Sequence, residues 1–165
     1  MASKSEVLRQ KLKHEGYWNY KEMYTFCFNW LKDNGYKISE KEYTEKQKNE
    51  GREIIIEWQA KKKVTDYYQN IIKMKWHILR MKDAEIERDG KKEETNKGEV
   101  KIEFYVDLEK DYEERWEDQP LWKFLRGVYE KYIIRTTTDE YEDRLRDDAL
   151  EYINQIKAFL QLASR

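Results

Sequence analysis

The longest regular pattern in the chain is an alternation of apolar and polar residues between Glu99 and Glu109. Every second position is apolar over this stretch, as a half-buried strand requires and a helix does not allow. A second apolar row of the same parity lies upstream. The two rows are Tyr68, Ile72, Met74, Trp76 and Ile78, followed by Val100, Ile102, Phe104, Val106 and Leu108. We therefore predict one long antiparallel hairpin with one solvated face.

The stretch between the rows, residues 83–98, is polar and contains turn signals at Asp89-Gly90 and at Asn96-Lys97-Gly98. A two-residue turn at Asp89-Gly90 pairs even with odd positions, whereas both apolar rows are even-numbered. Leu79 and Met81 also have the wrong parity for the first row. We predict a β-bulge here, or a second apolar contact on the outer face, with a bend near Asp83.

A second hairpin is predicted around the turn signal Asn49-Glu50-Gly51, which separates a weakly alternating segment, residues 36–47, from residues 53–58. Ile54, Ile56 and Trp58 share one face and would extend the apolar side of the central hairpin. Residues 5–15 fit either a short helix after a capping box or an edge strand, and we favour the strand. The sheet then has four to five antiparallel strands.

Helices are predicted in the sequence as well as strands, and the first lies between residues 5–15 and residues 36–47. Asn19 can cap a helix that runs to Asn34 and ends at Gly35. Its apolar positions recur at steps of three and four, but Phe26 and Trp30 lie off that stripe. This helix is therefore expected to pack on two sides, or on a partner.

The last third of the chain is predicted to be helical. Asp118 and Pro120 open a helix over residues 121–133, and Thr137-Thr138-Asp139-Glu140 forms a second capping box. A long apolar stripe follows. Its members are Tyr141, Leu145, Ala149, Tyr152, Ile153, Ile156, Phe159 and Leu160. We predict a single α+β domain, residues 1–165, in which helices, including a long C-terminal helix, cover one face of the antiparallel sheet.

Composition adds an aromatic core and a charged surface to this picture. Charged residues make up 41% of the chain, yet 15% is aromatic, with 6 Trp and 13 Tyr. The net charge of −1 gives no global field toward nucleic acid or an anionic membrane. No stretch approaches 18 consecutive apolar residues, and Met1 to Gln10 lack the apolar run of a signal peptide, so we expect neither a membrane span nor a signal peptide. The single Cys27 forbids an internal disulfide. We expect a soluble, cytoplasmic protein.

Catalytic and metal-binding motifs are absent from the sequence. Two histidines, His14 and His77, and one cysteine are too few and too scattered for a structural zinc site. Glycine-rich phosphate loops and a nucleophile elbow are missing, and acid pairs such as Asp147-Asp148 read as solvated surface. We therefore predict no catalytic residue, metal or cofactor, and a non-enzymatic protein.

One stretch interleaves basic and aromatic residues, as single-stranded nucleic-acid sites do. It contains Lys61, Lys62 and Lys63, followed by Tyr67 and Tyr68. Three lysines neutralise few phosphates, and Glu57 and Asp66 stand nearby. We favour a solvated connection between strands, so nucleic acid is not the expected partner.

Several short runs resemble those of a group of small proteins from archaea with reduced genomes. They are His14-Glu15-Gly16-Tyr17, Trp76-His77-Ile78, Lys82-Asp83, Asp89-Gly90-Lys91-Lys92, Asn96-Lys97-Gly98 and Asp111-Tyr112. The resemblance spans most of the chain and implies an archaeal source, but no function. The order strand, helix, antiparallel sheet, long terminal helix is similar to the helix-grip fold, whose members often hold apolar ligands between sheet and helix. That family has more strands, and no helix near Leu121.

Two main function classes follow, and we favour the first. In the first, a non-enzymatic interaction or scaffold module uses Trp30, Trp116 and Trp122 to dock a protein partner or a second copy of the chain. In the second, a carrier holds an apolar ligand between sheet and C-terminal helix. Its cavity would be lined by Trp58, Trp76, Phe104, Tyr129 and Tyr152. Single-stranded nucleic-acid binding by the basic and aromatic stretch is a further alternative.

Overall fold

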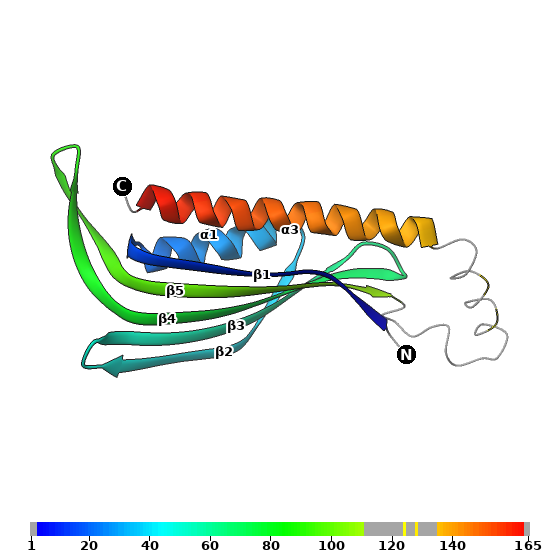
Figure 1. Cartoon of the computed structure of the whole chain (residues 1–165), viewed down its shortest axis with the longest axis horizontal. Helices are drawn as coiled ribbons and strands as arrows, with labels where there is room; N and C mark the ends of the chain where they lie inside the picture. The colour runs from blue at the N-terminus through cyan, green and yellow to red at the C-terminus, as the bar shows by residue number, and fades with distance from the viewer. Residues whose placement is uncertain (1–2, 111–123, 125–127, 129–134, 164–165) are drawn as a thin grey trace.

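The computed structural model describes residues 3–110, 124, 128 and 135–163 (Figure 1). Five strands and two helices have their bounds within this part. In chain order they are β1 (Ser3–Trp18), α1 (Tyr20–Asp33), β2 (Lys37–Lys48), β3 (Gly51–Lys63), β4 (Tyr68–Arg88), β5 (Lys91–Lys110) and α3 (Arg135–Ala163). Of the predicted helix over residues 121–133, only residues 124 and 128 are described, and both are helical; its cap at Asp118 and Pro120 lies outside the described residues. That residues 1–165 form one domain stays a prediction.

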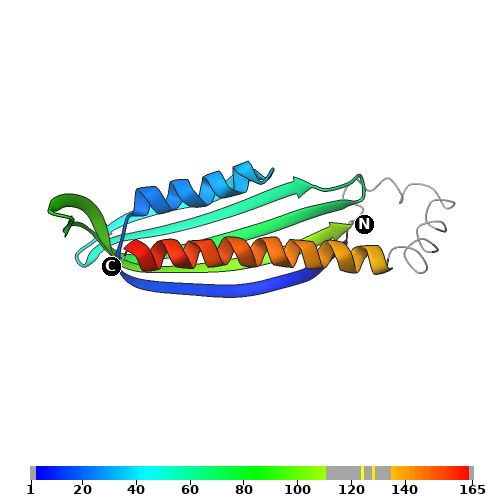
Figure 2. The same cartoon turned by 90° about the horizontal axis from the view of Figure 1, so that it is seen from above.

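The five strands form one antiparallel sheet in the order β1-β5-β4-β3-β2. Residues 5–15 are therefore strand, as favoured above, and β1 occupies the edge beside β5. Figure 2 shows α1 and α3 side by side on the same face of the sheet, with α3 the longer. Helix α3 lies against β1 and β5, and α1 lies nearer β2. The predicted α+β architecture is confirmed.

Helix α1 begins and ends where its capping residues require. The Asn19 side chain accepts a hydrogen bond from the Glu22 backbone N–H at 2.9 Å. After Asn34, Gly35 has φ +88°, a left-handed conformation that glycine adopts without strain. Met23, Cys27 and Leu31 are fully buried at steps of four, which directs one face of α1 onto the sheet.

The hairpin of β4 and β5 contains the predicted bulge. Asp89 and Gly90 form its two-residue turn, both with positive φ. The register shifts between Leu79 and Lys82, and Met81 thereby becomes buried. Gly98 is required opposite the bulge, because a Cβ there would lie 2.9 Å from the Met81 Cα.

The prediction of turn structure at Asn96-Lys97-Gly98 is wrong, since these residues lie within β5. Their glycine serves the close approach to the bulge. The Asn96 side chain accepts a hydrogen bond from the Tyr20 backbone N–H at 3.0 Å and so ties β5 to the start of α1. Gly98 and Asn96 therefore serve contacts with distant residues. Local sequence does not distinguish such residues from those of a turn.

The predicted second capping box does not begin the C-terminal helix. Helix α3 already includes Thr137 and Thr138, because it starts at Arg135. The Thr138 hydroxyl is instead 2.6 Å from the buried Tyr68 hydroxyl, so its polar group is satisfied across the core. The predicted apolar stripe is confirmed: Leu145, Ala149, Tyr152, Ile153, Ile156 and Leu160 are all buried.

The core between sheet and helices is aromatic. Its largest buried side chains include Trp18, Trp58, Trp76, Phe104 and Tyr152. Polar atoms on two of these rings find partners: the Trp58 Nε1 donates to Glu40 at 3.2 Å, and the Tyr152 hydroxyl donates to the Cys27 carbonyl at 2.9 Å. These contacts fix how the rings are oriented in the core.

Candidate functional site

Four of the residues proposed to line a ligand cavity lie close together in the core, where their side chains pack in contacting pairs. The Trp58 and Trp76 ring centroids are 5.3 Å apart, and those of Phe104 and Tyr152 are 6.2 Å apart. All four side chains are at most 1% exposed. Four surface hollows on the described residues are lined by other residues. Tyr129, the fifth proposed member, lies outside the described residues.

Of the proposed interaction residues, Trp30 is described, whereas Trp116 and Trp122 lie outside the described residues. Trp30 projects from the side of α1 that faces α3. Its indole stacks on the Tyr152 ring, with centroids 4.2 Å apart and planes 17° apart. One turn earlier, Phe26 stacks on Phe159 of α3 at 5.2 Å. The two residues off the main stripe of α1 therefore both stack on aromatic rings of the second helix.

These aromatic residues line an open groove between α1 and α3, which we call the helix groove. Its volume is ≈ 580 Å³. Its lining consists of Lys21, Glu22, Thr25, Phe26, Asn29, Trp30 and Asp33 from α1, and Phe159 from α3. Trp30 is only half-buried. The groove thus has aromatic side chains between its two helices and charged residues at both ends of α1.

The five residues of the basic and aromatic stretch do not share one surface. Strand alternation sends Lys61 and Lys63 to the outer face of the sheet, and Lys62 to the helix side, where its Nζ lies 5.7 Å from the Tyr36 ring centroid. Tyr68 is buried, and Tyr67 packs edge-on against it with centroids 5.0 Å apart. The proposed alternation of cations with stacking rings is therefore not formed.

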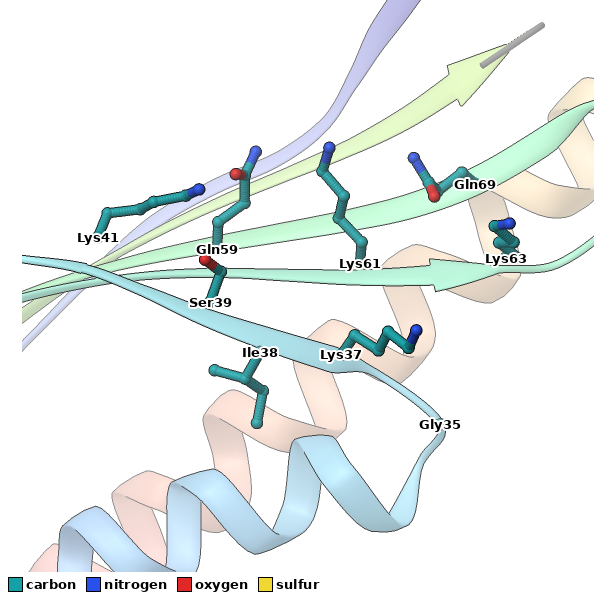
Figure 3. A pocket seen from close by; sticks show the side chains of 9 residues that line it. All are labelled: Gly35, Lys37, Ile38, Ser39, Lys41, Gln59, Lys61, Lys63 and Gln69. Atoms are coloured by element: carbon teal, nitrogen blue, oxygen red, sulfur yellow. The ribbon is translucent and has the colours of Figure 1, made fainter. Parts of the chain in front are cut away.

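Lys61 and Lys63 instead join residues of β2 in a second hollow, which we call the lysine hollow (Figure 3). Its volume is ≈ 660 Å³. Its lining comprises Gly35, Lys37, Ile38, Ser39, Lys41, Gln59, Lys61, Lys63 and Gln69. Sequence reasoning missed Lys37 and Lys41. The signal available was the hairpin itself, which brings the start of β2 beside the end of β3.

The described part of the chain contains no candidate metal site. No group of three or more His, Cys, Asp or Glu there could hold a metal ion. Cys27 is fully buried, and burial raises the pKa of its thiol above the ordinary value, so the nucleophilic thiolate is disfavoured.

Comparison with protein-family models, with curated proteins and with solved structures gives no match. No helix among the described residues is both long and apolar enough to cross a membrane. We therefore infer function from the helix groove and the lysine hollow themselves.

Proposed function

We propose that this protein is a non-enzymatic interaction module that receives an apolar helix of a partner protein in the helix groove. The observation that carries the proposal is the half-buried Trp30, whose ring stacks on Tyr152 and also lines the helix groove. Tryptophan contributes more binding energy to interfaces than most residues, especially when its ring is held in place beforehand.

The shape of the groove supports a helix as the occupant. Its α1 wall runs from Lys21 to Asp33, which is about 18 Å, or about three turns. A helix laid between two neighbouring helices places side chains at i, i+3 or i+4, and i+7 into such a groove. Phe26, Trp30 and Phe159 offer apolar contact along its length, and Lys21 and Asp33 offer charges at its two ends.

The packing of the core supports the module over the carrier. The space between sheet and helices, where a carrier would hold its ligand, contains the contacting rings of Trp58, Trp76 and Tyr152. A ligand there would have to displace closely packed side chains, which destabilises a protein core. An occupant of the helix groove displaces only solvent.

Peptides selected from a library of amphipathic helices test this proposal. We expect binders with apolar residues at helical spacing, and we expect Asn29→Arg to weaken them at least about tenfold by filling the groove with a charge. Asn29 lies between Phe26 and Trp30 without taking part in either stack. The matched control is Asn154→Arg at an exposed position of α3 outside the groove lining.

Native mass spectrometry of the purified protein completes the test, because it reports copy number and retained ligand together. The proposal predicts no retained apolar molecule. A retained lipid or other apolar ligand would replace the module by the carrier. Dimers that Asn29→Arg abolishes and Asn154→Arg preserves would identify a second copy, rather than another protein, as the occupant.

A further inference from the structure

The lysine hollow lies on the face of the sheet opposite the helices, so it is separate from the helix groove. In Figure 3, the side chains of Lys41, Gln59, Lys61 and Gln69 point to the same side of the ribbon, whereas Ile38 points toward α1. Of the nine residues that line the hollow, four are lysines and none is acidic. Ser39 and Gln59, which face each other across β2 and β3, add polar side chains at its floor.

The register of β2 and β3 places two of these lysines directly opposite each other. Lys37 pairs with Lys61 because a bulge at Lys41 shifts the register by one residue. Without that bulge, pairing from the turn, where Lys48 lies opposite Gly51, would have set Lys37 opposite Lys62. Like charges in directly opposed positions destabilise a sheet, so the hollow concentrates positive charge at the expense of stability.

Another like-charge pair on the outer face is neutralised, which the Lys37–Lys61 pair is not. Lys13 and Lys101 also face each other, across β1 and β5. The Glu99 carboxylate contacts both, at 3.3 and 3.6 Å, and also contacts Arg80. Burial raises the pKa of Glu99, but these cations together hold it below the usual range. Within the described residues, no carboxylate forms an ion pair with Lys37, Lys41 or Lys61.

We propose that the lysine hollow binds a compact polyphosphate, such as the triphosphate chain of a nucleotide or inorganic triphosphate. Four lysines that line one hollow without an acidic residue attract several negative charges held close together, and the hollow's volume is within the range of small-molecule sites. The hydroxyl of Ser39 and the amide of Gln59 can donate to phosphate oxygens. An anion there also relieves the repulsion between Lys37 and Lys61.

The lining favours phosphate recognition over the binding of a nucleic-acid strand. Single-strand sites stack bases on aromatic side chains, and no aromatic residue lines this hollow. The nearby Tyr68 is buried against Thr138 instead. Carboxylates limit the charged area, since Glu57 lies one outward position beyond Gln59 on β3, and Glu109 accepts a 3.5 Å hydrogen bond from Gln69. We therefore infer a short anion that is recognised by its phosphates and not by a base.

Calorimetric titration with inorganic triphosphate tests the site. We expect Lys37→Gln/Lys61→Gln to weaken binding by about tenfold or more, because two of the four positive charges that line the hollow are lost. The matched control is Lys91→Gln/Lys92→Gln, which removes the same charge from exposed positions at the turn end of β5 and should change affinity less than about twofold. Lys41→Gln provides a second, single-site variant that leaves the opposed pair intact and should also weaken binding.

Thermal melts separate a binding role from a structural one. Without ligand, Lys37→Gln/Lys61→Gln should melt at the same temperature as the wild-type protein or higher, since it removes a repulsive pair. With triphosphate, only proteins that retain the hollow should gain melting temperature. Equal binding by both double variants, or loss of binding in the Lys91/Lys92 control, would overturn the proposal.

Two further ligands identify what the hollow recognises. ATP should bind about as tightly as inorganic triphosphate if the phosphates alone are recognised. Much tighter binding of ATP would contradict recognition without a base. Tighter binding of a single-stranded oligonucleotide than of triphosphate, abolished by Lys37→Gln/Lys61→Gln, would replace the compact anion by nucleic acid. The helix groove plays no part in these outcomes.

Discussion

Two neighbouring tryptophans in the core differ in one polar contact. The Trp58 indole N–H donates to Glu40, whereas the buried Trp76 indole N–H has no hydrogen-bond partner. Both rings are almost fully buried and contact each other. They therefore allow the value of one hydrogen bond to be measured at nearly constant burial.

Trp58→Phe should accordingly destabilise the protein more than Trp76→Phe. Both changes remove similar ring volume, but only Trp58→Phe loses a hydrogen bond, which adds about 1 kcal/mol to its effect on the free energy of unfolding. Urea denaturation of the two variants measures the difference. A larger loss for Trp76→Phe would mean that its indole N–H is satisfied, for example by buried water.

Two tyrosines have hydroxyl groups whose pKa is raised in the folded protein. Burial, opposed by a hydrogen bond from Asn70, raises the pKa of Tyr36 from 10.0 to about 12. Burial and a hydrogen bond to Glu40 raise the pKa of Tyr24 to about 12. The folded protein thus holds these phenolic protons more tightly than the unfolded chain does.

This difference predicts how stability depends on alkaline pH. The contribution of Tyr36 and Tyr24 is fully present below about pH 10 and is lost as the pH rises toward 12. The free energy of unfolding should therefore fall over that interval, and tyrosinate absorbance should appear at a higher pH in the folded protein than in the unfolded protein. Superimposable titrations of the two states would contradict the burial of these hydroxyl groups.

At the scale of elements, α3 buries more apolar residues than α1, the other helix whose bounds are described. Ile156 is fully buried on its stripe, so Ile156→Ala should lower the free energy of unfolding by roughly 2 to 5 kcal/mol. Asn154→Ala, at an exposed position two residues away, is the matched control and should have little effect. Thermal or chemical melts that do not distinguish the two variants would show that α3 does not cover the sheet. A loss that depends on protein concentration would place Ile156 in a seam between copies.

The period of the apolar residues predicted the strands and helices well, because an element that is buried on one face has apolar residues at a regular spacing. The even-numbered rows of β4 and β5, the stripe of α3 and the Asn19 cap were all predicted correctly. Errors arose where a residue serves a distant contact. Gly98 resembles a turn residue but accommodates the bulge at Met81, and Thr138 resembles a cap but meets Tyr68 across the core.

At the scale of the whole molecule, both candidate sites depend on how separate elements meet, which periodicity does not encode. Trp30 was predicted as an interaction residue, yet its stacking on Tyr152 depends on how α1 and α3 share a face of the sheet. Lys37 and Lys41 were missed because a bulge at Lys41 sets the register of β2 against β3. A shift of the strand register by one residue changes which side chains lie opposite each other, and the sequence of β2 alone does not predict that shift.

The central claim, that the helix groove and not the interior of the core receives the partner, is tested most directly by fluorine NMR. The chain has six tryptophans, and 5-fluorotryptophan would give each its own resonance, with that of Trp30 assigned through Trp30→Phe. Addition of a selected helical peptide should shift the Trp30 resonance, with saturation at one peptide per chain, and leave those of Trp58 and Trp76 in place. An unchanged Trp30 resonance, with shifts at Trp58 or Trp76, would contradict the claim and point to a ligand inside the core.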